Sequence, residues 1–306
     1  MAKIRVGVVG AGVMGGFHIK IASSLPDAKL IGIFDLDQSR AQEIADKYHT
    51  IALPSLDALM NGAEAIIVAS PTSTHLEVCK IAINRKKHLL VEKPLTMDSS
   101  SSAEIVSLAS AKKLVLAVGM IERFNPAFTK AFSLTKHEKI LGIDIRRFSP
   151  FPERISDASV VWDVMIHDLD LAFLLGKVEI DSLKAFGRKV KTSVLDEAEA
   201  TLYFKDGTIA RVSASRVKEG KIRDIQITTE RCIYEADLLN KKLYRRSFET
   251  LVDKEEIETK STDQLTLEQK DFYSAINKGR APCCPGDQAL KVIRLAEEVE
   301  AKCSCQ

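Results

Sequence analysis

The chain has 306 residues, of which 45% are hydrophobic and 28% are charged, a composition typical of soluble globular proteins and long enough for two domains. Its formal net charge of +2 gives no bulk electrostatic reason to expect nucleic acid or an acidic membrane surface as a partner. No apolar run approaches the roughly 18 residues of a membrane-spanning helix, so we expect no membrane association.

The first predicted element is a buried parallel strand at residues 3–9, an apolar run rich in β-branched side chains. Gly10, Gly12 and Gly15 follow in G-x-G-x-x-G spacing and lead into apolar residues at helical spacing. The first glycine permits a tight turn, the second lets a pyrophosphate approach the backbone, and the third lets helix and strand pack closely. The helix N-terminus then offers N–H groups to the phosphates. The alternative is a glycine-rich turn in another kind of α/β protein.

A second strand is predicted at residues 30–34, and it ends at Asp35. This acid lies about 20 residues beyond the glycines, where dinucleotide-binding folds carry the residue that binds the ribose hydroxyls. A carboxylate at this position favours NAD, because it would repel the 2′-phosphate of NADP. Arg40 lies further along and fits an exposed helix position better than a phosphate clamp.

The rest of the first 120 residues alternates strand and helix, which predicts a doubly wound parallel sheet with helices on both faces. Thr74 is expected to cap one helix, and Asp98 or a neighbouring serine another. The predicted helices are 38–48, 55–61, 75–85 and 98–112, and the predicted strands are 65–68, 88–91 and 114–118.

The pattern changes after Gly119, which predicts a second domain at residues 121–306. Strands follow one another between residues 180 and 246, with a hairpin turn at 205–208, as in an antiparallel sheet. Further elements are predicted as helices at 126–135, 158–175, 265–277 and 287–301 and a strand at 139–148. The predicted boundary also allows the C-terminal helix to pack against the first domain.

Four of the six cysteines crowd the C-terminus, at positions 283, 284, 303 and 305. An adjacent pair without a nearby histidine is poor spacing for metal ligands. We therefore expect no metal, and reduced thiols in a cytoplasmic protein.

Two groups of residues are candidates for chemistry at the carboxyl edge of the first sheet, where open α/β sheets bind ligands. Residues 70–72 (SPT) follow one predicted strand, and Glu92-Lys93-Pro94 follows the next. A lysine at this edge is either a solvated surface charge or a functional group, and its position alone leaves both open.

Asp163 and His167, in the second half of the chain, are a further candidate pair for chemistry. They are four residues apart on a predicted helix and therefore share a face, together with Asp170. A carboxylate beside a histidine fixes its orientation and raises its basicity. The alternative is an Asp–His pair on a helix surface.

Six motifs in this order resemble the Gfo/Idh/MocA oxidoreductases, the family of glucose–fructose oxidoreductase and inositol dehydrogenase. They are GAGVMG at 10–15, FDLD at 34–37, SPTSTH at 70–75, EKP at 92–94, RFNPAF at 123–128 and DVMIHDLD at 163–170. The resemblance implies an N-terminal Rossmann domain, residues 1–120, and a C-terminal α+β domain with an open, mostly antiparallel sheet. It also implies an NAD-dependent dehydrogenase that assembles as a homodimer or homotetramer through that sheet.

The resemblance further implies roles for individual residues. Lys93, Asp163 and His167 are the expected catalytic residues. The expected cofactor-binding residues are Gly10, Ala11, Gly12, Val13, Met14, Gly15, Asp35, Ser70, Pro71, Thr72, His75, Glu92 and Lys93. The expected substrate-binding residues are Lys93, Arg123, Asn125, Arg154, Asp163 and His167. The chain departs from the family at Met165, where many members have glycine.

A looser resemblance covers residues 146–170 and points to the family's UDP-N-acetylglucosamine 3-dehydrogenases. Arg146, Arg147 and Arg154 suit a diphosphate, although each is also consistent with a solvated surface position. The expected reaction is hydride transfer from a secondary hydroxyl of a sugar or sugar nucleotide to NAD. The alternatives are a polyol, inositol or cyclic-alcohol dehydrogenase of the same fold, and a non-catalytic NAD-binding regulatory protein.

Overall fold

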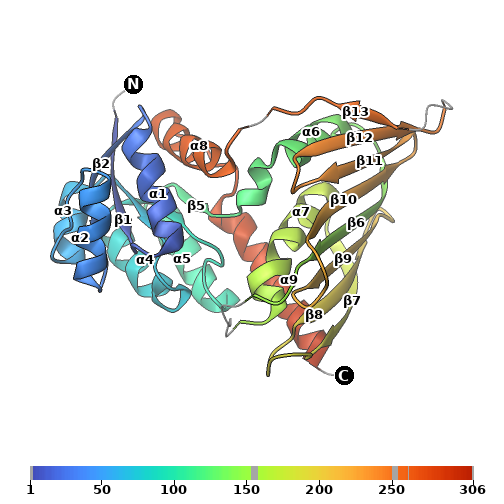
Figure 1. Cartoon of the computed structure of the whole chain (residues 1–306), viewed down its shortest axis with the longest axis horizontal. Helices are drawn as coiled ribbons and strands as arrows, with labels where there is room; N and C mark the ends of the chain where they lie inside the picture. The colour runs from blue at the N-terminus through green and yellow to red at the C-terminus, as the bar shows by residue number, and fades with distance from the viewer. Residues whose placement is uncertain (1–2, 153–157, 250–253, 261, 305–306) are drawn as a thin grey trace. The chain divides into compact units, whose positions relative to one another are not determined.

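The computed structural model describes residues 3–152, 158–249, 254–260 and 262–304. The chain forms two compact units (Figure 1), residues 1–120 with 265–291 and residues 121–264 with 292–306. We call them the first and second units. Residues 265–291, which the sequence places in 121–306, thus belong to the first unit.

The first unit is built from five strands and the helices between them. Its strands are β1 (Ile4–Val9), β2 (Ala28–Phe34), β3 (Ala65–Val68), β4 (His88–Val91) and β5 (Leu116–Val118). Its helices are α1 (Val13–Ser24), α2 (Gln38–Lys47), α3 (Leu56–Gly62), α4 (His75–Asn84), α5 (Ser99–Ala111) and α8 (Gln264–Lys278). The short segment Thr72–Thr74 is a 3₁₀ turn.

The five strands form one sheet in the order β2-β1-β3-β4-β5, and every neighbouring pair is parallel. The strand order reverses between β1 and β3, which is the topological switch point of a doubly wound sheet. Ligands bind beside this point at the carboxyl ends of the strands. The predicted parallel sheet is confirmed, and its switch point adjoins the glycine-rich loop.

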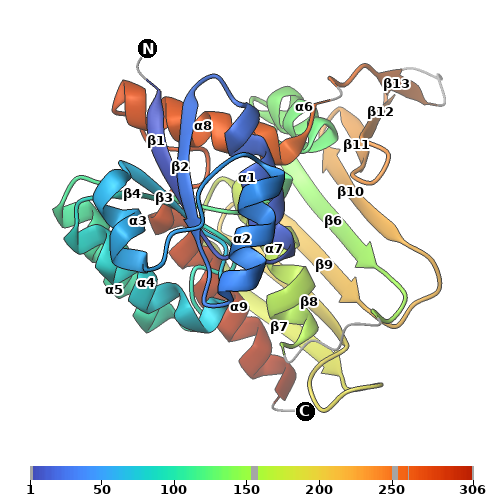
Figure 2. The ribbon, with the colours of Figure 1, turned by 60° about the vertical axis from the view of Figure 1, so that its left-hand side comes forward.

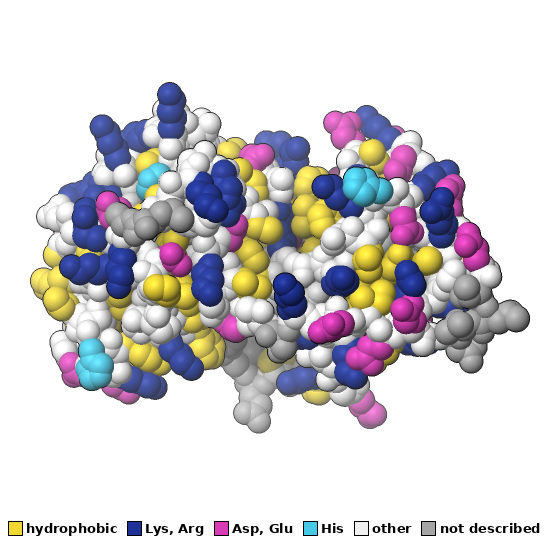
Figure 3. Space-filling model, turned by 90° about the horizontal axis from the view of Figure 1, so that it is seen from above, with side chains coloured by type: hydrophobic (Ala, Val, Ile, Leu, Met, Phe, Trp, Pro, Cys, Tyr) yellow, Lys and Arg dark blue, Asp and Glu magenta, His cyan; other side chains and the backbone are white. Residues whose placement is uncertain are grey.

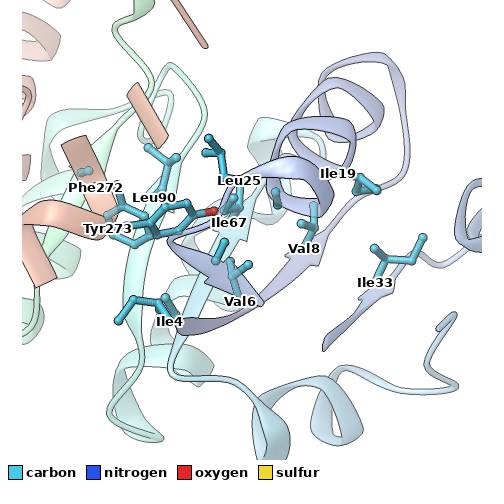
Figure 4. Packing of buried hydrophobic residues seen from close by; sticks show 14 of the residues in the cluster. Ile4, Val6, Val8, Ile19, Leu25, Ile33, Ile67, Leu90, Phe272 and Tyr273 are labelled. Carbon is cyan, nitrogen blue, oxygen red and sulfur yellow. The ribbon is translucent and has the colours of Figure 1, made fainter. Parts of the chain in front are cut away.

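The two faces of β1 explain how the helices cover the sheet. Val6 and Val8 are fully buried in a cluster that includes residues of α1 and α8. Figure 4 shows Phe272 and Tyr273 of α8 packed against side chains of the sheet. Gly7 faces the other way, where an added Cβ would lie 2.6 Å from Leu59 of α3. α8 therefore completes the core of the first unit.

Side-chain caps begin three of its helices. Asp37, Ser55 and Asp98 each accept a hydrogen bond from a backbone N–H in the first turn of α2, α3 and α5. The predicted Asp98 cap is therefore confirmed. The predicted Thr74 cap is wrong, because its hydroxyl donates to the carbonyl of Pro71, three residues earlier, instead of bonding to α4.

The second unit combines a large sheet with a few helices. Its strands are β6 (Ile140–Phe148), β7 (Ile180–Arg188), β8 (Glu197–Phe204), β9 (Ile209–Ser215), β10 (Ile222–Thr229), β11 (Cys232–Asp237), β12 (Lys242–Ser247) and β13 (Glu255–Ile257). Its helical segments are the 3₁₀ turn Ile121–Phe124, α6 (Pro126–Thr135), the π-helical segment Val161–Met165 and α7 (Ile166–Gly176). The last helix, α9 (Gly286–Ser304), contains the point where the two units divide.

The eight strands lie in the order β13-β12-β11-β10-β6-β9-β8-β7. Only β6 and β9 pair in parallel among the described strands of this sheet, and its other neighbours are antiparallel. Helices α6 and α7 lie on one face (Figures 1 and 2). The predicted open, mostly antiparallel sheet is confirmed.

Residue alternation assigns the apolar side chains of this sheet to its helix-covered face. Val212, Ile225 and Ile227 are at most 1% exposed, and their strand neighbours are polar. The sequence of these strands also carries Ile209 and Ile233, and five such apolar residues predict an adhesive open face. That expectation is wrong for Val212, Ile225 and Ile227, which are buried, whereas Ile209 and Ile233 are half-buried. The period of two in a strand sends the three buried residues to one side, where α6 and α7 cover them.

The open face carries charge pairs between strands. Arg146 of β6 forms two hydrogen bonds to Asp224 of β10, and Arg211 of β9 donates to Asp144. Exposed pairs of this kind contribute little stability, about 0–1 kcal/mol each. The face of the whole molecule seen in Figure 3 also shows basic side chains scattered among acidic and uncharged ones. No described helix is long and apolar enough to cross a membrane.

Candidate active site

The glycine loop after β1 has the geometry that the motif predicts. Gly10 has φ +96°, and an added Cβ would lie 2.6 Å from the backbone of Ala69 and Ser70. A Cβ on Gly15 would lie only 1.9 Å from the carbonyl oxygen of Gly10. Both positions therefore require glycine for the fold of the loop itself.

Gly12 is different, because an added Cβ there would meet nothing within 4 Å. Gly12 is also the N-cap of α1, without a side-chain cap, and the first turn of α1 holds no acidic residue. The N–H groups of this turn are thus available to an anion. Neighbouring Val13 and Met14 are exposed at 67% and 37%. A backbone kept open at a helix N-terminus fits the pyrophosphate of a dinucleotide.

Asp35 closes the other side of this loop at the end of β2. Its Oδ2 accepts a hydrogen bond from the Ala11 N–H at 2.6 Å, and its Oδ1 accepts from the Asp37 N–H and from Arg40. Burial raises the pKa of Asp35, but these hydrogen bonds outweigh it and hold the pKa below its ordinary value. The carboxylate therefore stays charged, as binding of ribose hydroxyls requires.

His75 joins two of the predicted cofactor-binding loops. It is 1% exposed, with Nε2 2.9 Å from the Ser70 carbonyl and Nδ1 near the Pro94 and Leu95 carbonyls, at 3.1 and 3.2 Å. This holds the loop after β3 beside the loop after β4. The burial of His75 favours an indirect role in cofactor binding, whereas Pro71 is exposed and Thr72 is half-buried.

Lys93 follows β4 and precedes a cis peptide bond to Pro94. Its backbone N–H donates to Oε2 of Glu92 at 3.2 Å, and Oε1 of Glu92 is 2.8 Å from Nε2 of His18. Burial raises the pKa of Glu92, but the hydrogen bond from His18 and the hydrogen bond and charge of Lys93 hold it below the ordinary value. Lys93 thus stands at the carboxyl edge of the sheet beside a carboxylate.

Asp163 and His167 lie in one continuous helical segment of the second unit. The predicted α-helix is interrupted here, because Val161–Met165 is π-helical and α7 begins only at Ile166. Asp163 therefore sits on the wider turn and His167 on the first turn of α7, and both are half-buried. Single π-helical turns inside helices are frequent at functional sites.

The start of this segment is fixed by α9. The Ser159 hydroxyl donates to Oε2 of Glu300 at 2.5 Å, and the Ser159 carbonyl accepts from the Asp163 N–H. Met165, the departure from the family pattern, is 0% exposed. Its side chain therefore fills the core of the second unit.

Two predicted substrate-binding residues have structural partners. Arg123 is 2% exposed and forms a forked pair with Asp170. Asn125 is 1% exposed, caps α6 through the Ala127 N–H and donates to the Leu238 carbonyl. Burial of both favours support of the fold over contact with substrate. Arg154, which was also predicted to bind substrate, lies outside the described residues.

The arginines proposed for a diphosphate also have acidic partners. Arg147 is 5% exposed and lies between Asp168 and Glu122, with hydrogen bonds to both. Arg146 pairs with Asp224 on the open face. Sequence reasoning missed this buried network, since a DLD pattern alone does not name the arginines that its carboxylates meet.

The structure thus assembles the glycine loop, Asp35 and Lys93 on one sheet edge of the first unit, and Asp163 with His167 on one helix of the second. Within the first unit it also places His18, Glu268 and Gln269 beneath Glu92, which the sequence analysis did not single out. The only available signal was the position of His18, three residues after Gly15. Among the described cysteines, Cys79, Cys232 and Cys303 are free thiols.

Comparison with known proteins agrees with this geometry. Residues 4–120 match the model of the oxidoreductase family with an NAD-binding Rossmann fold, and residues 143–235 match the GFO/IDH/MocA C-terminal domain. The chain is 33% identical over 310 residues to UDP-N-acetylglucosamine 3-dehydrogenase of Acidithiobacillus ferrooxidans, covering 98% of this chain and 97% of that protein.

A solved structure of that dehydrogenase superimposes with a TM-score of 0.94 at 32% identity, covering 100% of this chain and 99% of the other. The scyllo-inositol 2-dehydrogenase (NAD⁺) of Bacillus subtilis is 27% identical over 311 residues, covering 92% of this chain and 88% of that protein. The chain therefore belongs to the GFO/IDH/MocA family of NAD-binding oxidoreductases.

Proposed function

We propose that this protein is an NAD-dependent dehydrogenase that oxidises a secondary hydroxyl of a sugar nucleotide, with the 3-hydroxyl of UDP-N-acetylglucosamine as the first candidate. The observation that carries the proposal is the 33% identity to a UDP-N-acetylglucosamine 3-dehydrogenase over 98% of this chain. This match includes the second unit, which carries Asp163 and His167, as well as the cofactor domain.

The residues present fit NAD. The open backbone at Gly12 and the N-terminus of α1 suit the pyrophosphate, and the charged Asp35 suits two free ribose hydroxyls. When bound, NAD supplies the hydride acceptor, and the protein's own residues position the alcohol and move its proton.

We assign the proton transfer to His167. A neutral imidazole accepts the hydroxyl proton as a general base, a role typically worth about 10²–10⁴-fold in rate. Asp163, four residues earlier, orients the imidazole or the sugar. The Lys93 ammonium stabilises the developing negative charge on the substrate oxygen.

A second candidate function is oxidation of a polyol. It is favoured by the 27% identity to an NAD-dependent scyllo-inositol 2-dehydrogenase over 92% of the chain. The test is a panel of UDP-sugars, free sugars and inositols, with formation of NADH followed for each. We expect the highest kcat/KM with UDP-N-acetylglucosamine. A higher value with an inositol would favour the second candidate, and no turnover with any alcohol would favour a non-catalytic NAD-binding protein.

We also propose a homodimer or homotetramer through the open sheet face of the second unit. The open face carries Phe186 of β7 and Ile222 of β10, which are 56% and 36% exposed. An open sheet face with exposed aromatic and aliphatic side chains suits an interface with a second copy. Free thiols are consistent with a cytoplasmic location, which cell fractionation would test.

A further inference from the structure

A buried polar cluster of the first unit joins Glu92 to three residues that have no role assigned so far. It consists of His18 of α1, Glu92 after β4, and Glu268 and Gln269 of α8. The side chains of His18 and Glu92 are 1% and 13% exposed, and Glu268 and Gln269 are 3% and 0% exposed. Burial of so many polar groups destabilises the fold unless they form hydrogen bonds with one another.

The hydrogen bonds of Gln269 fix the orientation of His18. Its Nε2 lies 3.0 Å from both the His18 carbonyl oxygen and Nδ1 of the same residue, while its Oε1 accepts from the Tyr273 hydroxyl. A carbonyl oxygen can only accept, so the atom facing it must be the amide nitrogen. Nδ1 of His18 therefore accepts a hydrogen bond, and the ring proton resides on Nε2.

The Nε2 proton of His18 points at Glu92. The distance from Nε2 to Oε1 of Glu92 is 2.8 Å, and the other carboxylate oxygen accepts from the Lys93 N–H at 3.2 Å. A continuous chain of hydrogen bonds therefore runs from Gln269 through His18 and Glu92 to the backbone of Lys93. We call Gln269, His18 and Glu92 together the Gln269 relay.

Glu268 determines where the negative charge of this cluster resides. Its two carboxyl oxygens are buried and have no hydrogen-bond partner among the described residues. Glu268, Glu92 and His18 each have one polar atom within 4.8 Å of the other two. Burial, together with the charges of Glu92 and Asp271, raises the pKa of Glu268 well above its ordinary value. Two adjacent carboxyls do not both ionise in such a site, so Glu268 is the neutral acid and Glu92 the carboxylate.

We propose that Gln269 is a positioning residue for Lys93, acting through His18 and Glu92, and that neutral Glu268 leaves the charge on Glu92. The inference rests on the catalytic role proposed for Lys93. Without the relay, Glu92 can rotate away from the Lys93 N–H, and the segment that carries the lysine loses its anchor. A misplacement of about 1 Å at a reacting group costs on the order of 10²-fold in rate.

The same atoms also suit a divalent cation, since one histidine and two carboxylates are common metal ligands. The hydrogen-bonding pattern favours the relay, because the Nε2 proton of His18 occupies the lone pair that a metal would need. Metal content is therefore an outcome of the test.

The kinetic test compares Gln269→Leu with Phe272→Leu. Gln269→Leu breaks the relay, whereas Phe272 lies on the same helix, is 0% exposed and belongs to the apolar core. We expect Gln269→Leu to lower kcat by about 10- to 100-fold with little change in the Kd of NAD. Phe272→Leu should lower the melting temperature and leave kcat near the wild-type value. Equal losses of kcat in the two variants, or none in Gln269→Leu, would overturn the proposal.

A second test does not depend on turnover, and so separates failure of the relay from failure of the proposed function. Nitrogen-15 NMR should show His18 with its proton on Nε2, and the Lys93 amide should exchange slowly with solvent. Gln269→Leu should accelerate exchange at Lys93, and Phe272→Leu should not do so selectively. Wild-type exchange at Lys93 in Gln269→Leu would overturn the relay even if the enzyme is active.

Glu268→Gln tests the charge assignment. The stability contributed by a carboxyl whose folded pKa is raised is fully present below its unfolded pKa, and it is lost progressively as pH rises from there through the folded pKa. The groups around it, His18, Glu92, Lys93 and Asp271, are unchanged by the variant. We expect Glu268→Gln to melt higher than the wild type at pH 8, and this advantage to vanish as pH falls toward 4.5, the ordinary pKa of the carboxyl.

Metal analysis of the purified wild type, with and without added Zn²⁺ or Mn²⁺, completes this test. We expect no stoichiometric metal and no rise in melting temperature. One bound ion per chain that Glu268→Gln abolishes, or a variant less stable than the wild type at pH 8, would overturn the proposal.

Discussion

Replacement of Gly12 by alanine tests whether glycine is required at this position for NAD binding or for folding. Gly12 has φ −69° and ψ −165°, values that alanine adopts without strain, and an added Cβ would meet nothing within 4 Å. The variant should therefore fold with wild-type stability. The methyl group would, however, occupy the space into which the pyrophosphate must approach the backbone.

The magnitude follows from the cost of one extra methyl group in a packed contact, about 1–3 kcal/mol. We expect the Kd of NAD to rise roughly 5- to 150-fold in Gly12→Ala, measured by calorimetry. Gly16→Ala is the matched control, because Gly16 also has nothing within 4 Å of its added Cβ but lies inside α1. It should bind NAD normally and gain about 0.8–1 kcal/mol from helix propensity.

Gly15→Ala completes the series, since its Cβ would lie 1.9 Å from the Gly10 carbonyl oxygen. This variant should lose stability as well as NAD binding. The reasoning is refuted if Gly12→Ala binds NAD as tightly as the wild type, or if its melting temperature falls as far as that of Gly15→Ala.

Three further predictions concern the roles assigned to single residues. Lys93→Met should lower kcat by about 10²–10³-fold while NAD still binds, and near-normal turnover would return Lys93 to a surface charge. NAD should bind more tightly than NADP in calorimetry; Asp35→Ser should narrow the difference, because it removes the carboxylate and frees Arg40 from its ion pair. Oxidation should fall at acid pH as His167 is protonated, and His167→Asn should lose the acid limb of kcat/KM with most of the activity. Asp163→Asn should keep that limb and move it to lower pH, and a shift to higher pH would contradict the pairing.

The local elements of the first unit could be predicted because their signals lie within short stretches. The glycine spacing, the apolar strands and the Asp98 cap each depend on neighbours a few residues away. The Thr74 cap failed because its hydroxyl had a nearer acceptor, the Pro71 carbonyl. The π-helical turn at Val161–Met165 has no equally direct signal, since its residues suit an α-helix equally well.

Long-range partners could not be predicted from one sequence. Gln269 and His18 are 251 positions apart, and only the fold shows that α8 packs in the first unit. Arg123 and Arg147 are residue types that suit an anionic ligand, but both pair with carboxylates of α7. Arg123 pairs with Asp170, 47 positions later, and Arg147 pairs with Asp168, 21 positions later. The alternation in β10 could be predicted, but the face that α6 and α7 cover depends on tertiary packing.

The most direct test of the proposed function is the formation of NADH by the purified wild-type chain with UDP-N-acetylglucosamine and NAD, with His167→Asn as the inactive control. We predict turnover by the wild type, a large loss in the variant at unchanged NAD affinity, and a product oxidised at the 3-hydroxyl by mass spectrometry and NMR. NAD binding without NADH formation from this substrate, or equal rates for the two proteins, would contradict the account.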